Sequence, residues 1–180
     1  AQPICLDTAT GSLAIAHNGN LTNAQPLRRE LSAMGALFAS GTDTEVILHL
    51  LARETAGSLA DRMLAVMPRL EGAYSLTLTD GHEVVAARDP YGWRPLVLGL
   101  RPARPASPAN PAGEPEAWVI ASETPALALC GAEYVREIAP GEVLSLQGGA
   151  PRSVQGKQAV PRRACVFEHV YFARPDAVVF

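Results

Sequence analysis

The chain has 180 residues, of which 48% are hydrophobic and 18% charged, and its formal net charge is −3. This length fits one domain of ordinary size, and this composition is typical of a globular protein with a sizeable core. Lys and Arg are scattered, which excludes a basic field for nucleic acid. No apolar run approaches the roughly 20 residues of a membrane helix. We therefore expect no nucleic-acid partner, no membrane contact and a cytoplasmic location.

The first part of the chain predicts one strand followed by three helices. Residues 12–17 have the pattern of a short strand. Apolar residues then recur at helical spacing in residues 22–34, 40–57 and 58–70. Because this spacing places apolar side chains on one face, each stretch is expected to form a helix.

Polar residues mark where two of these helices begin. Ser40, Thr42 and Asp43 are alternative N-caps for the second helix. Glu45 lies three residues beyond Thr42, which is the spacing of a capping box. Ser58 is expected to cap the third helix.

After residue 72 the pattern changes to alternation and apolar runs, which are typical of strands. Strands are expected at 73–80, 83–89, 95–100 and 118–122 and on both sides of Pro140-Gly141, with a short helix at 123–131 and a Pro- and Ala-rich loop at 101–117. Asp80-Gly81 is a hairpin turn signal between the first two strands. Runs of helices followed by runs of strands predict an α+β domain with mostly antiparallel sheets.

An Asn-Gly pair, Asn18-Gly19, follows the first strand and precedes a helix rather than a second strand. Such a pair is common in ordinary tight turns. It can also present two donors to one point, the Asn side-chain amide and the Gly backbone N–H, because Gly lets a ligand approach the backbone closely. Two donors aimed at a developing negative oxygen form an oxyanion hole. The spacing alone leaves both interpretations open, with the turn favoured.

Other polar residues have equally open interpretations. Asp43 either caps a helix or binds the ammonium group of a substrate. Arg88, Asp89 and Arg94 form a charged cluster for which a local salt bridge is expected. The histidines show no metal-ligand spacing, so a structural role is expected for His17, His49, His82 and His169.

The three cysteines, Cys5, Cys130 and Cys165, lie far apart and form no CxxC pair. Neither a closed zinc site nor a structural disulfide is therefore expected. Each is expected to be a small buried apolar side chain. The chain begins AQPICLD, without Met, and ends ARPDAVVF. We interpret it as a fragment or a processed piece.

Six stretches together resemble the amidophosphoribosyltransferase family of N-terminal-nucleophile (class II) glutamine amidotransferases. In chain order they are AIAHNGNLTNA, GTDTEVILHLL, LEGAYSLTL, VAARDPYGWRPLVLG, IASETPALALCGAEYVREIAPGE and CVFEHVYFARPD. The HNGN and RDPxGxRPLxLG motifs are shared among class II amidotransferases. FEHVYFARPD is the discriminating stretch, because it is similar to the junction of the glutaminase and phosphoribosyltransferase domains.

The resemblance implies the four-layer αββα sandwich of N-terminal-nucleophile hydrolases, incomplete at its N-terminus. It implies that Asn18 and Gly19 form the oxyanion hole and that Asp43 holds the α-amino group of glutamine. In this family an N-terminal Cys thiolate attacks the glutamine side-chain carbonyl and releases ammonia. The ammonia displaces pyrophosphate from phosphoribosylpyrophosphate to give 5-phosphoribosylamine, the first step of purine synthesis.

The chain departs from the family pattern at both ends. Because it begins with Ala1, the family's nucleophile would lie upstream, and this fragment alone is expected to be inactive. Residues 1–158 correspond to the glutaminase domain, and residues 159–180 to a linker and the start of the phosphoribosyltransferase domain. That missing domain would use Mg²⁺. Cys165 matches a [4Fe–4S] ligand of some members, although this fragment alone would hold no cofactor. The full-length enzyme is expected to form a homo-oligomer.

Two alternatives remain at the level of the sequence. The chain can belong to another class II amidotransferase, such as the glucosamine-6-phosphate enzyme, which a sugar-isomerase sequence downstream would reveal. It can also belong to a non-catalytic glutamine-binding module. A parent protein whose mature N-terminus lacks Cys would favour this alternative.

Overall fold

The computed structural model describes residues 2–8, 11–106, 108, 110–157, 160, 161, 163 and 165–177, with His169 described by its backbone alone. The chain divides into two compact units. The first comprises Ala1–Arg94 and Ala139–Arg163, and the second comprises Pro95–Ile138 and Ala164–Phe180. Each unit combines helices with an antiparallel sheet, so the α+β class is confirmed. None of the helices in the described part of the chain has both the length and the apolar character that a membrane crossing requires.

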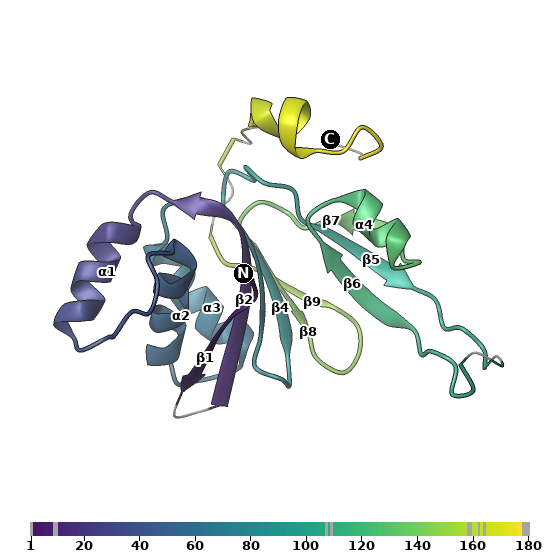
Figure 1. Cartoon of the computed structure of the whole chain (residues 1–180), viewed down its shortest axis with the longest axis horizontal. Coiled ribbons are helices and arrows are strands. Elements are labelled where there is room, and N and C mark those ends of the chain that lie inside the picture. The colour runs from purple at the N-terminus through teal and green to yellow at the C-terminus, as the bar shows by residue number, and fades with distance from the viewer. Residues whose placement is uncertain are drawn as a thin grey trace. The chain divides into compact units, whose positions relative to one another are not determined.

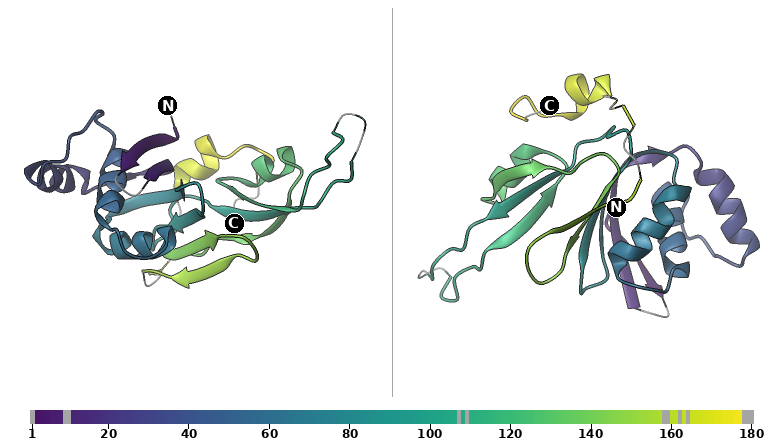
Figure 2. Two further views of the ribbon diagram at one scale, coloured as in Figure 1. Left: turned by 90° about the horizontal axis from the view of Figure 1, so that it is seen from below. Right: turned by 180° about the vertical axis from the view of Figure 1, so that it is seen from behind.

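The first unit is a six-stranded antiparallel sheet with two of its helices packed on one face and a third beside them (Figure 1). Its strands are β1 Ile4–Thr8, β2 Gly11–Leu21, β3 Gly72–Thr79, β4 Val84–Arg88, β8 Glu142–Leu146 and β9 Arg152–Gln155, and this is also their spatial order. Its helices are α1 Ala24–Ala33, α2 Asp43–Arg53 and α3 Leu59–Val66, followed by the 3₁₀ turn Met67–Arg69. The right-hand view of Figure 2 shows α2 and α3 together on the same face of the sheet.

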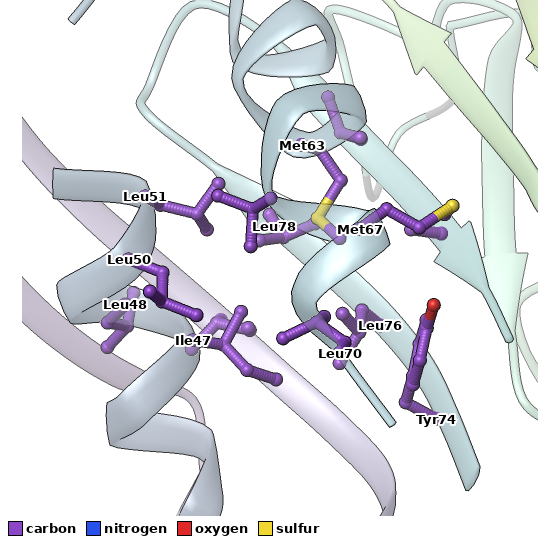
Figure 3. Packing of buried hydrophobic residues seen from close by; sticks show 14 of the residues in the cluster. Ile47, Leu48, Leu50, Leu51, Met63, Met67, Leu70, Tyr74, Leu76 and Leu78 are labelled. Carbon is purple, nitrogen blue, oxygen red and sulfur yellow. The ribbon is translucent and has the colours of Figure 1, made fainter. Parts of the chain in front are cut away.

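The core of the first unit lies between these helices and the sheet. Leu50 and Leu51 of α2 and Met63 of α3 point toward Leu76 and Leu78 of β3 (Figure 3). All five side chains are almost completely buried. Burying a Leu or Met side chain contributes about 1.5–3 kcal/mol, so this apolar layer stabilises the placement of α2 on the sheet.

The second unit is a three-stranded antiparallel sheet in the order β6-β5-β7. Its elements are β5 Val97–Arg101, β6 Ala117–Ala121, α4 Thr124–Leu129, β7 Glu133–Glu137 and the short π-helix Glu168–Phe172. Leu127 of α4 packs against Val97 of β5 in a small core. The loop between β5 and β6 contains a bridge between Arg104 and Glu114, which keeps its two described arms paired.

The predicted strand at 12–17 is longer than expected, and the predicted turn at Asn18-Gly19 is wrong. Strand β2 continues to Leu21, and Gly19 is paired with Tyr74 of β3. Backbone pairing with a distant strand therefore overrides the local preference of Asn-Gly for a turn. The sequence pattern predicts neither β1 nor β9, and both lie at the edges of the six-stranded sheet.

The predicted positions of the helices are confirmed, whereas only one of the two predicted caps makes its expected side-chain bond. Ser58 and Asp61 form a full capping box at the start of α3, in which each side chain bonds the other residue's backbone N–H. Thr42 is the N-cap of α2 but makes no side-chain cap bond. The expected capping box of Thr42 with Glu45 is wrong, because the Glu45 carboxylate accepts N–H groups from residues 39 and 40 instead.

The charged cluster at 88–94 bonds mainly to backbone. Asp89 is fully buried and accepts the backbone N–H groups of Tyr74, Tyr91 and Trp93. Burial raises the pKa of Asp89, although these bonds and the nearby Arg88 act in the opposite direction. Arg88 donates to the carbonyl oxygens of residues 92 and 94. The cluster thereby fixes the turn between β4 and β5.

The expectation that the cysteines are buried apolar residues is wrong for two of the three. Cys5 and Cys130 are exposed, and Cys165 is partly buried; all three are free thiols. Cys5 alternates with the less exposed Ile4 and Leu6 on the edge strand β1, so its side chain points away from the helices.

Candidate active site

A pocket of about 440 Å³ lies where β2 ends and α2 begins. Its lining consists of Gln2, His17, Gly19, Asn20, Leu21, Thr22, Ala24, Gln25, Arg28, Gly41, Thr42, Asp43 and Thr44. The antiparallel pairing of β2 with β3 and the packing of α2 on the sheet bring these segments together. Two of the three predicted substrate-site residues, Gly19 and Asp43, therefore line one pocket.

Asp43 is the first residue of α2, and its carboxylate connects the helix to β2. Its Oδ2 atom accepts the backbone N–H of Leu21 at 2.7 Å, and its Oδ1 atom lies 3.6 Å from His17 Nδ1. Burial acts to raise the pKa of Asp43, but the neighbouring His17 ring and the bond from the Leu21 N–H outweigh it and hold the pKa at about 2. The group is therefore an anion at neutral pH. The positive end of the helix dipole stabilises the same charge.

This anion faces a small, polar pocket, which is the arrangement needed to bind an ammonium group. The charge is preformed, because its hydrogen bonds do not depend on a ligand. Thr42, and not Asp43, is the N-cap residue of α2, so the simpler interpretation of Asp43 as the helix cap is wrong.

His17 is almost fully buried and contacts Asp43 from β2. Its Nδ1 atom is 3.1 Å from Thr44 Oγ1, whereas its Nε2 atom has no hydrogen-bond partner among the described residues. Nε2 lies 2.9 Å from where a side-chain carbon on Gly19 would stand. The expected structural role of His17 therefore explains Nδ1, which has a partner, but not Nε2. An unpaired buried polar atom is costly and needs an explanation of its own.

Gly19 adopts a backbone conformation that other residues rarely adopt, with φ of +150°. A Cβ atom at this position would overlap the carbonyl oxygen of Ala73 on β3. Only glycine fits at this position, so no side chain covers the strand backbone where it borders the pocket.

Asn18 lies beside the pocket without lining it. It is half-buried in β2, opposite Ser75 of β3. Because successive side chains of a strand point to opposite faces, the Asn18 side chain lies on the face opposite to His17. The structure thus places Asn18 and Gly19 side by side in the chain, and their joint role as oxyanion donors stays a prediction.

Sequence reasoning missed the contribution of Gln2. Its side-chain amide donates to the carbonyl oxygen of His17 at 2.9 Å and accepts the His17 N–H. Gln2 thereby holds the backbone of β2 next to the pocket, where it also forms part of the wall. It belongs to no motif, so no local signal indicated this contact.

Among the described residues, no three His, Cys, Asp or Glu side chains gather closely enough to hold a metal ion. An iron–sulfur cluster needs four ligands of the thiolate kind, and the chain has three cysteines. Its own residues therefore do not fit such a cluster. A ligand role for Cys165 stays a prediction that requires cysteines outside this sequence.

Comparison with known families and proteins gives a consistent result. The glutamine amidotransferase domain family matches residues 1–109. The amidophosphoribosyltransferase of Rhizobium etli is 41% identical over 183 residues, which cover 99% of this chain and 34% of that protein. The Bacillus subtilis amidophosphoribosyltransferase is 38% identical over 167 residues, which cover 93% of this chain and 32% of that protein. The chain thus spans about a third of the length of these relatives.

Solved structures show the same relationship. Glutamine phosphoribosylpyrophosphate amidotransferase of B. subtilis, complexed with ADP and GMP, matches with a TM-score of 0.83 and 36% identity, over 98% of this chain and 36% of that one. An allosteric regulatory enzyme of purine biosynthesis matches with a TM-score of 0.85 and 36% identity, over 99% of this chain and 36% of that one. These likenesses confirm the expected α+β fold of the N-terminal-nucleophile amidotransferases. The chain belongs to the glutamine amidotransferase domain family.

Proposed function

We propose that this chain is the glutaminase part of an amidophosphoribosyltransferase. In this proposal, glutamine hydrolysis supplies the ammonia that converts phosphoribosylpyrophosphate to 5-phosphoribosylamine, in the first step of purine synthesis. The observation that carries the proposal is the pocket in which the Asp43 carboxylate and the bare backbone of Gly19 meet. The 41% identity to a curated amidophosphoribosyltransferase along almost the whole chain supports the choice of reaction.

The proposed chemistry assigns one role to each end of glutamine. Asp43 would bind the α-ammonium group, because it is anionic and already oriented by Leu21. The Gly19 N–H and the Asn18 amide would donate to the side-chain oxygen as it becomes negative. Such donors act on the transition state more than on the bound substrate, so they accelerate the reaction instead of only tightening binding.

The remaining steps need groups outside this sequence. A thiolate would add to the side-chain carbon of glutamine, and the C–N bond would break as the nitrogen takes up a proton and leaves as ammonia. Water would then hydrolyse the thioester to glutamate and restore the thiol. The ammonia would displace pyrophosphate from the phosphoribosyl carbon in a second domain, which would use Mg²⁺. We assign neither the thiol nor the site of phosphoribosyl transfer to the described residues.

The proposal is tested with the full-length protein that carries this chain. Purified protein is incubated with glutamine and phosphoribosylpyrophosphate, and glutamate and pyrophosphate are measured together. Equal amounts of the two products support the proposal. Glutamine turnover that does not depend on phosphoribosylpyrophosphate, with transfer of the nitrogen to a sugar phosphate, would indicate a different class II amidotransferase. Glutamine binding without turnover would indicate a binding module.

The cell location and assembly state are also part of the proposal. We expect a cytoplasmic homo-oligomer, as the family resemblance implies. Light scattering on the purified full-length protein measures its mass, and a monomeric mass would contradict this part.

A further inference from the structure

One wall of the pocket is a loop without helix or strand, residues 37–42, between α1 and α2. Gly41 and Thr42 of this loop line the pocket, and Asp43 follows them directly in the chain. The loop has no backbone ladder to fix it. Its backbone groups therefore need other partners if the wall, and the start of α2, are to keep one position.

Glu45 supplies partners for the N–H groups of the loop. Its two carboxylate oxygens accept the N–H of Ala39 at 2.7 Å and that of Ser40 at 2.8 Å. One of them also accepts the Ser40 hydroxyl at 2.6 Å. Glu45 is itself buried, and these bonds lower its pKa against the opposite effect of burial. The carboxylate is thus a charged anchor that extends from α2 back to the loop.

Arg28 supplies partners for the carbonyl groups of the same loop. Its Nη1 atom donates to the Ser40 oxygen at 2.8 Å, and its Nη2 atom donates to the Thr42 oxygen at 2.7 Å. The guanidinium also lies over the Phe38 ring, 4.1 Å from its centre. Phe38 in turn packs edge-on against His49 of α2, with ring centres 4.5 Å apart. The planar fork of Arg matches two carbonyl groups at once.

We propose that Arg28 and Glu45 are positioning residues for glutamine binding. They hold residues 39–42 from α1 and from α2, and thereby set where the Asp43 carboxylate stands. Charge-assisted hydrogen bonds are roughly twice as strong as neutral ones, so this pair orders the loop before a ligand arrives. The inference rests on the proposed function of the pocket.

The position of Asp43 affects bound glutamine and the transition state equally, because the ammonium group does not react. Loss of the anchors therefore raises KM and leaves kcat almost unchanged. We expect Arg28→Met and Glu45→Gln each to raise the glutamine KM of the full-length enzyme roughly 10-fold. Synthesis from added ammonia stays unchanged, because it does not use the pocket. Arg29→Met, an exposed neighbour on α1, is the matched control and leaves both activities unchanged.

The double variant separates positioning from direct contact with the ligand. Because both residues act through one loop, Arg28→Met combined with Glu45→Gln raises KM clearly less than the product of the single effects. A fully multiplicative increase would overturn the inference and indicate that Arg28 binds glutamine itself. An unchanged KM in both single variants would also overturn it, as would an equal loss of ammonia-dependent synthesis, which indicates damage to the fold. A wild-type enzyme that uses ammonia but not glutamine would instead contradict the proposed function.

Discussion

The carboxylate of Asp43 accepts the backbone N–H of Leu21 at 2.7 Å, although the two residues are 22 positions apart in the sequence. This bond joins the last residue of β2 to the first residue of α2. It fixes an anion at the point where strand and helix enclose the pocket. The expected behaviour of the site follows from this connection.

Asp43 should titrate well below an ordinary aspartate. Its pKa in the folded chain is about 2, against an ordinary value of 3.8. A carboxyl group with a lowered folded pKa stabilises the fold above the ordinary pKa, and this stability is lost as the pH falls through about 2. Because the side chain is partly exposed, we expect the contribution to be about 1 kcal/mol. A ¹³C titration of the carboxyl carbon checks this, and a midpoint near the ordinary value would contradict it.

Gly19 should not tolerate a side chain. A Cβ atom would overlap the carbonyl oxygen of Ala73, and the φ of +150° disfavours any other residue. We expect Gly19→Ala to lower the free energy of unfolding by at least about 2 kcal/mol. Gly149→Ala is the control, since nothing lies within 4 Å of its added carbon. Equal stability of the two variants in urea unfolding would show that β2 does not take this path.

Local signals in the sequence predict those features that local interactions determine. Ser58 and Asp61 form their capping box within one turn of helix, so α3 begins where its sequence indicates. Asn18-Gly19 indicates a turn locally, whereas the structure continues the strand because β3 pairs with it. That partner lies more than 50 residues further along the chain, and no local pattern reveals it.

In the candidate active site, too, local sequence signals do not reveal the contacts between distant segments. The sequence identifies Asp43 as a substrate-binding residue only through the resemblance to a family, because an aspartate at the start of a helix is also an ordinary cap. The contacts of His17 with Gln2 and Thr44 join three separate segments, and none of these residues forms a motif with the others. Likewise, Glu45 has the spacing of a capping-box residue but bonds to a loop that is placed by tertiary structure.

Asn18 should matter for glutamine hydrolysis and not for the use of ammonia. If its amide is one of two donors to the oxyanion, Asn18→Ala should lower the glutaminase rate of the full-length enzyme by roughly 10²–10³-fold. Ammonia-dependent synthesis requires no such donor and should persist. Both rates are measured on one preparation. A parallel fall in both, or a glutaminase rate within a few-fold of the wild type, would show that Asn18 is not an oxyanion donor.

The assignment of the pocket to glutamine is tested most directly by the dependence of both activities on Asp43. We expect Asp43→Asn, which removes the charge and keeps the shape, to lower kcat/KM for glutamine on the order of 100-fold in the full-length enzyme. Ammonia-dependent synthesis should be unchanged, and Asp7→Asn, an exposed control on β1, should affect neither. An unchanged kcat/KM for glutamine in Asp43→Asn would contradict the assignment of this pocket to glutamine.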